Sequence, residues 1–136
     1  MKVFLDANVL FSGAQAGSPM RQFLDTLARH CHLIAHPIAI DEARRNISLK
    51  RPNWMPGLRS LESAVSISET MGSIADVELA EKDRPILRAA IGSRCTHLLT
   101  GDIQHFGHLL GKTVAEVKIV SPRLLALEIK SRGWID

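Results

Sequence analysis

Cysteine and long apolar runs are both scarce in this chain of 136 residues. Its two cysteines, Cys31 and Cys95, match no metal-binding spacing and are too few for a disulfide scaffold, which favours a reducing compartment. No apolar run approaches the length of a membrane span, and the first residues do not form a secretion signal. We therefore expect a cytoplasmic protein that does not enter a membrane.

Several further signals are missing. The sequence has no glycine-rich phosphate loop, which argues against a nucleotide-binding protein of that type, and it has no internal repeat, linker or low-complexity tract. Charge is nearly balanced, with 17 Lys and Arg against 14 Asp and Glu. A polyanionic partner is permitted by this charge but not required. With 46% hydrophobic residues, the chain suits one domain over residues 1–136.

The apolar pattern alternates between strand-like and helix-like segments, which is typical of an α/β fold. The strands are short apolar runs that suit burial on both faces, as in a parallel sheet. We expect strands at 3–5, 32–36, 65–68, 96–100 and 118–120. We expect helices at 19–30, from 37 onward, and at 58–64, 84–93, 103–110 and 123–132. The residues after Asp6 are expected to form a polar turn and 13–17 a loop, while 74–81 shows little regular pattern.

Four acidic residues fall where these elements meet. Asp6 and Asp102 follow strands, Asp83 starts a helix, and Glu42 lies on a helix that begins where a strand ends. Since ligands bind at the carboxyl edge of an open α/β sheet, all four can converge there. Clustered carboxylates repel one another unless a cation neutralises them. Oxygen-only ligands with no supporting His or Cys favour Mg²⁺ or Mn²⁺ over zinc, and such ions can activate water against a phosphodiester.

Each of these acids also has a simpler interpretation. Asp6 is equally well placed to cap a following helix, and Asp83 precedes a proline-containing helix in the manner of an ordinary cap. Glu42 can pair with Arg45 on a solvated helix face. Asp102 is less easily explained in this way, because neither the strand nor the turn requires an acid there. The residues alone leave these alternatives open.

Four segments in order nevertheless resemble one family. They are FLDANVLFSG, IDEARRN, KDRPILRAA and HLLTGDIQHF, and together they span essentially the whole chain. They are similar to segments of the PIN-domain ribonucleases, which include the VapC-type toxins of toxin–antitoxin pairs. The resemblance implies a three-layer sandwich, in which helices flank a central twisted parallel sheet with strand order 3-2-1-4-5.

The resemblance also implies a set of site residues. The acidic catalytic positions are Asp6, Glu42, Asp83 and Asp102. Of these, Asp6, Asp83 and Asp102 would hold Mg²⁺ or Mn²⁺, and Glu42 would position or deprotonate the attacking water. The polar positions that hold carboxylate oxygens in place are Asn8, Ser12 and Thr100. Such supporting groups are a general requirement of metal sites.

The function implied by the resemblance is a metal-dependent endoribonuclease that forms a homodimer and is silenced by an antitoxin protein. One departure keeps an alternative open: Gln104, His105 and Phe106 stand where many family members carry a further acid. A catalytically degenerate PIN-like module that binds RNA or protein would tolerate that loss. His105 could replace the missing ligand or bind a phosphate, but the local pattern favours a plain surface residue. A receiver-type phosphoacceptor is disfavoured, because Asn8 occupies the place of its usual second acid.

Overall fold

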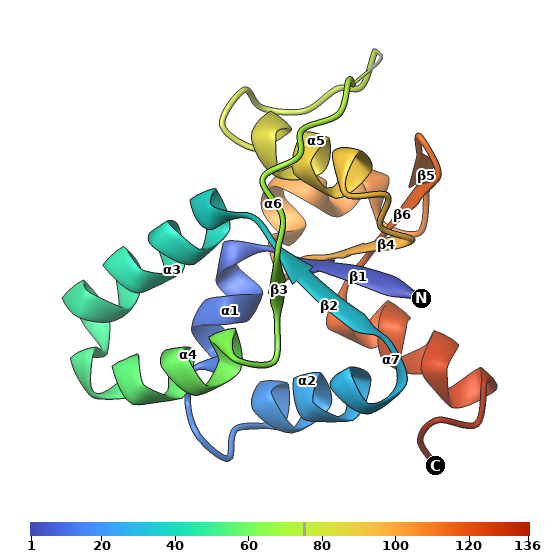
Figure 1. The fold of residues 1–136 in the computed structure, drawn as a ribbon. Coiled ribbons are helices and arrows are strands. Elements are labelled where there is room, and N and C mark those ends of the chain that lie inside the picture. The colour runs from blue at the N-terminus through green and yellow to red at the C-terminus, as the bar shows by residue number, and fades with distance from the viewer. Residues whose placement is uncertain (75) are drawn as a thin grey trace.

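A computed structural model describes residues 1–74 and 76–136. Its centre is a twisted six-stranded sheet with strand order β3-β2-β1-β4-β6-β5 (Figure 1). The strands are β1 (Lys2–Leu5), β2 (His32–Ala35), β3 (Ser66–Ile67), β4 (His97–Leu99), β5 (Thr113–Val114) and β6 (Val117–Val120). Every pairing is parallel except that between β5 and β6. The sheet is therefore mostly parallel, as its buried, apolar strands predict.

Helices surround this sheet. They are α1 (Ala7–Gly13), α2 (Pro19–His30), α3 (Pro37–Lys50), α4 (Met55–Glu62), α5 (Arg84–Gly92), α6 (Ile103–Phe106) and α7 (Pro122–Ser131), with 3₁₀ turns η1 (Pro52–Trp54) and η2 (Gly107–Leu109). In Figure 1, α5 lies above the strands, and α2 and α7 lie below them. No helix of the described residues is long and apolar enough to cross a membrane. This arrangement is the predicted α/β sandwich.

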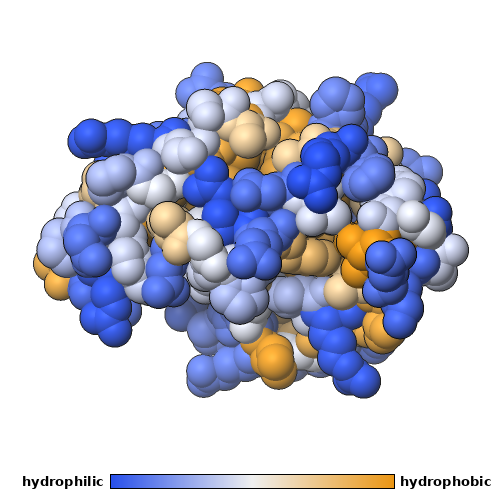
Figure 2. Space-filling model, turned by 90° about the horizontal axis from the view of Figure 1, so that it is seen from below, coloured by the Kyte–Doolittle hydropathy of each residue, from blue (hydrophilic) through white to orange (hydrophobic). Residues whose placement is uncertain are grey.

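The first strand forms the middle of the core. Val3, Phe4 and Leu5 are fully buried, because β1 is paired on both edges and covered on both faces. On the lower side of the molecule, α7 contributes the buried residues Leu125 and Ile129. The surface seen from below is largely hydrophilic, and its apolar side chains stand in small separate groups (Figure 2). The burial of β1 fixes the position of the residue that follows it, Asp6.

The predicted strand order is confirmed with one addition. The five expected strands correspond to β3-β2-β1-β4-β6, and the sixth, β5, joins the edge in an antiparallel hairpin with β6. The connecting residues Ala115 and Glu116 both have positive φ, at 47° and 71°. Tight hairpin turns of this kind usually carry Asn or Gly, and their absence here hides the turn from sequence inspection.

Several predicted boundaries are corrected. The turn expected after Asp6 is wrong, because α1 begins at once with Ala7. The helix expected at 58–64 begins three residues earlier at Met55, and the helix expected at 103–110 divides into α6 and η2. The expected strands at 32–36, 65–68 and 96–100 are each shorter, and the first ends at Ala35 because His36 caps α3.

Candidate active site

A cavity of about 410 Å³ opens near the carboxyl ends of the central strands. Its lining includes all four predicted acids, which come from four separate segments of the chain. The lining residues are Asp6, Ala7, Asn8, Phe11, Glu42, Asn46, Lys50, Lys82, Asp83, Ile86 and Asp102. The convergence inferred from the sequence is therefore present in the fold.

Asp6 is both a helix cap and a wall of this cavity. Its residue is 6% exposed, and its Oδ1 accepts a hydrogen bond from the Ala7 amide at 2.8 Å. Its Oδ2 accepts hydrogen bonds from Thr100 Oγ1 at 2.8 Å and from Asn8 Nδ2 at 3.0 Å. Burial raises the pKa of Asp6, these hydrogen bonds oppose the rise, and the charge of Glu42 adds to it. Asp6 therefore caps α1 and also lines the cavity, so its interpretations as a helix cap and as a site residue are compatible.

Two of the three predicted supporting residues connect Asp6 to the loop after β4. Besides donating to Asp6, Thr100 Oγ1 accepts the Asp102 amide at 3.0 Å, and Asn8 Oδ1 accepts the Gly101 amide at 2.7 Å. Both contacts fix Asp102 relative to Asp6. Ser12 is exposed and is not among the described residues that line the cavity.

Asp102 is held by His105, one turn later in α6. Its Oδ1 accepts the His105 amide at 3.0 Å, and its Oδ2 lies 2.6 Å from His105 Nδ1. Burial opposes ionisation, but the hydrogen bonds and charge of His105 and the charge of Lys82 outweigh it and lower the pKa of Asp102. His105 therefore contacts a predicted site residue, which the interpretation as a plain surface residue did not include. The i, i+3 spacing from a capping acid was the available signal.

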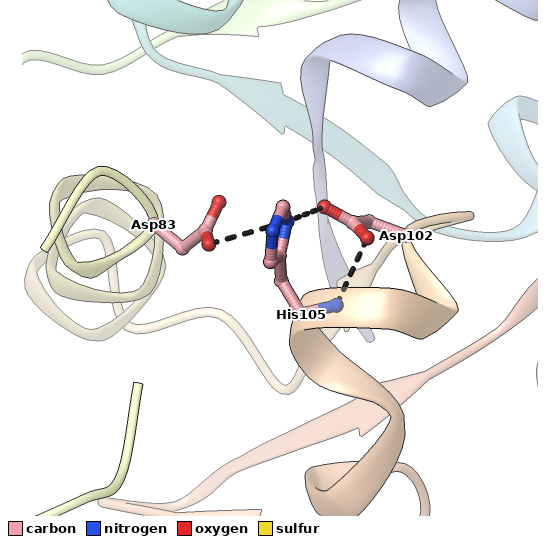
Figure 3. Close-up of side chains that lie close together, drawn as sticks. All are labelled: Asp83, Asp102 and His105. Carbon is pink, nitrogen blue, oxygen red and sulfur yellow. Dashed lines mark hydrogen bonds and ion pairs between the residues drawn. The ribbon is translucent and has the colours of Figure 1, made fainter. Parts of the chain in front are cut away.

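Asp83 occupies the cap position of α5 but does not act as a cap, because its side chain makes no capping hydrogen bond. Its Oδ2 is buried and has no hydrogen-bond partner among the described residues. His105 Nδ1 lies 3.5 Å from this oxygen, and Figure 3 shows the imidazole ring between the two carboxylates. A buried carboxylate oxygen without a donor is costly unless a ligand satisfies it.

Glu42 lies on the solvent side of the same cavity. The residue is exposed on α3, and no ion pair to Arg45 or to any other described residue is formed by its carboxylate. Arg44 instead pairs with Asp41 and with Glu62. Glu42 therefore remains available to a group that enters the cavity.

The donor atoms of this site suit a divalent cation. One ligand atom each from Asp83, Asp102 and His105 lies within 4.8 Å of the others, and they form the one group of this kind among the described residues. The unpartnered Asp83 Oδ2 gives this group an oxygen that a cation would satisfy. Lys50 and Lys82 also line the cavity, and of these two lysines Lys82 was not assigned to the site from the sequence.

Comparison with known proteins identifies the fold. No family model matches the sequence, and no curated protein matches it. The structure resembles that of VapBC2 from Rickettsia felis, solved with a DNA fragment from their promoter, with a TM-score of 0.63 and 15% identity over 89% of this chain and 98% of that chain. It also resembles PAE2754 from Pyrobaculum aerophilum, with a TM-score of 0.58 and 17% identity over 96% of both chains. The chain therefore has a PIN-domain, VapC-like fold.

Proposed function

We propose that this chain is a Mg²⁺- or Mn²⁺-dependent endoribonuclease and the toxin of a toxin–antitoxin pair. The main support is the meeting of Asp6, Glu42, Asp83 and Asp102 in one cavity, although they lie far apart in the sequence. Carboxylates collected in this way contribute little to stability and are typical of a metal-dependent hydrolytic site. The VapC-like fold is the second support.

The roles of the residues follow from their positions. Asp6, Asp83 and Asp102 hold the cation, which when bound polarises a phosphate and lowers the pKa of water. Glu42, exposed at the cavity, accepts a proton from the attacking water.

Other residues of the lining prepare the site for this chemistry. Thr100 and Asn8 hold the Asp6 carboxylate in one orientation through hydrogen bonds. The ammonium groups of Lys50 and Lys82 attract the phosphates of a single-stranded or looped RNA.

The partners belong to the same proposal. The structural neighbour VapBC2 was solved bound to a DNA fragment from their promoter. By analogy, this chain would be silenced by an antitoxin protein that covers the acidic cavity, and two copies would form a homodimer. Co-expression with any small reading frame that adjoins the gene, followed by size-exclusion chromatography, tests both partners.

Cleavage of RNA by the purified chain tests the activity. We expect cleavage with Mn²⁺ or Mg²⁺ and none with a chelator. Asp102→Asn should reduce the rate at least about 100-fold, since it removes charge at the cation. Asp41→Asn is a matched control, because Asp41 is exposed on α3 beside Glu42 but pairs with Arg44 at 3.3 Å outside the cavity. Unchanged cleavage by both Asp6→Asn and Asp102→Asn would contradict the proposal.

A second candidate is supported by one observation, the presence of His105 where an acid is usual in the family. In that case the chain binds RNA without cutting it. Gel-shift and cleavage assays on the same preparation separate the two functions, since the degenerate module predicts RNA binding that is insensitive to Asp102→Asn.

A further inference from the structure

We propose that His105 Nδ1 is a ligand of the cation in this cavity, and that this nitrogen makes the site select a first-row transition-metal ion over Mg²⁺. The inference rests on the proposed function only in that the cavity binds a divalent cation. It concerns which class of ion is bound and which side chain decides the choice.

The distances around His105 match a shared ion. Nδ1 lies 2.6 Å from Asp102 Oδ2 and 3.5 Å from Asp83 Oδ2, and the three ligand atoms lie within 4.8 Å of one another. Two neighbouring ligand atoms that are each about 2.1 Å from one ion lie about 3 Å apart. Only small shifts of the side chains are therefore needed. In Figure 3 the three side chains point toward one another from the start of α5 and from α6.

The surroundings fix the ring at this place. His105 and Asp102 belong to the same capped turn, and the His105 side chain is 27% exposed. The ring cannot satisfy both carboxylates, because Asp83 Oδ2 has no hydrogen-bond partner among the described residues while Nδ1 pairs with Asp102. A cation in contact with all three atoms would satisfy that oxygen. Nδ1 would then carry no hydrogen, and the neutral ring would keep its hydrogen on Nε2.

The nitrogen ligand changes which ion is favoured. Mg²⁺ prefers an octahedral shell of oxygen atoms and gives up water reluctantly. Imidazole is a good ligand for first-row transition metals, whose affinities rise from Mn²⁺ through Fe²⁺ to Co²⁺. A set of carboxylate oxygens with one imidazole nitrogen therefore favours those ions. An aspartate at position 105 would restore an all-oxygen set.

The experiment compares the binding of Mn²⁺, Co²⁺ and Mg²⁺ by calorimetry in the parent chain and in His105→Asp. We expect the parent to bind Mn²⁺ at least tenfold more tightly than Mg²⁺, and Co²⁺ more tightly still. In His105→Asp the ratio of Mn²⁺ to Mg²⁺ affinity should fall by at least tenfold. Circular dichroism establishes that each variant is folded. His32→Asp serves as the control, because His32 is exposed on β2 and should leave the ratio unchanged.

A spectroscopic readout keeps this test independent of activity. Nitrogen modulation in the electron spin echo of bound Mn²⁺ should be present in the parent and absent in His105→Asp. If the parent binds Mn²⁺ and cleaves RNA but its metal preference is unaltered in His105→Asp, the inference fails while the proposed function stands. If the parent binds none of the three ions, both fail.

Discussion

A single hydroxyl group connects the two acids that follow strands. Thr100 is 1% exposed, and its Oγ1 donates to Asp6 Oδ2 at 2.8 Å while it accepts the Asp102 amide at 3.0 Å. Without this group, Asp6 Oδ2 keeps only the hydrogen bond from Asn8, and the Asp102 amide loses its acceptor. The position of one acid relative to the other depends on a side chain that binds no cation itself.

Thr100→Val tests this role, because valine keeps the shape of threonine and loses the hydroxyl. We expect the free energy of unfolding in metal-free buffer to fall by about 1–3 kcal/mol, the usual cost of unsatisfied buried polar groups. Urea denaturation measures it. Metal affinity should fall roughly tenfold or more, as for other residues that orient ligands. Thr100→Ser keeps the hydroxyl, so its free energy of unfolding and metal affinity should stay close to those of the parent. Equal losses in Thr100→Ser and Thr100→Val would refute the hydrogen-bond explanation.

The sequence was sufficient to predict the positions of the residues that directly follow buried strands. Asp6 and Asp102 could be predicted because an apolar run determines where its last residue lies. Ser12 was not so constrained: α1 begins at Ala7, which places Ser12 one turn beyond Asn8, about 6 Å further along the axis. The contact of His105 with Asp102 follows from their i, i+3 spacing, but its approach to Asp83 at 3.5 Å depends on the direction of a short helix, which no local pattern specifies.

Among the elements, the packing of α4 against the end of α1 is unusually close. Gly57 lies inside α4, and a Cβ atom there would be 1.8 Å from the carbonyl oxygen of Ala14. A backbone atom cannot move aside as a flexible side chain can. This contact explains why a residue that normally ends helices is found within one.

Gly57→Ala should therefore destabilise the chain in spite of alanine's better helix propensity. We expect a loss of about 3 kcal/mol or more in the free energy of unfolding, or failure to fold, because the two helices must separate. Thermal melting of Gly107→Ala gives the comparison. A Cβ atom at Gly107 would meet only Ile103 Cγ2 at 3.5 Å, an ordinary contact, so the change there should stay below about 1 kcal/mol. If the two variants melt at similar temperatures, α4 can shift away from α1 and the close contact does not explain Gly57.

The elements with strong local signals were predictable and the others were not. Ser18 before Pro19 marks a helix start that the structure confirms. Ser121 before Pro122 has the same pattern, and α7 begins at Pro122, one residue before the start expected at 123. The start of α4 at Met55 was missed because Pro56 and Gly57 look like helix breakers, although proline is tolerated in the first turn. In α4 the close contact of Gly57 with Ala14, and not a local sequence signal, determined the structure.

In the whole molecule, a partly buried acid, Glu128, connects the last helix to the sheet. Glu128 of α7 lies 2.8 Å from His97 Nε2 of β4 and 3.2 Å from Lys118 Nζ of β6, with Arg132 at 3.5 Å. Burial opposes ionisation, but the contacts with His97 and Lys118 outweigh it and lower the pKa of Glu128 below its usual 4.5. This acid therefore links the last helix to two central strands.

Global stability should depend on pH through this residue. Because the pKa is lower in the folded state, the unfolded chain takes up the proton first, so the stabilisation is complete above pH 4.5 and is lost as the pH falls through the folded pKa. We expect Glu128→Gln to cost about 1–2 kcal/mol at pH 7 and progressively less as the pH falls below 4.5. Urea titrations across this range measure the difference. Glu116→Gln is the control, because Glu116 is exposed, and the change in its free energy of unfolding should vary little with pH. If the loss for Glu128→Gln is the same at every pH, the ionic explanation is contradicted.

The central place of β1 also has a consequence for how the protein is made. The strand β1 leaves the ribosome before one of its two sheet neighbours, β4, which lies almost 100 residues later in the chain. A nascent or truncated chain that stops before Asp102 contains Asp6 without the opposite wall of the cavity. The proposed cation site therefore cannot be assembled until the residues around Asp102 have been synthesised.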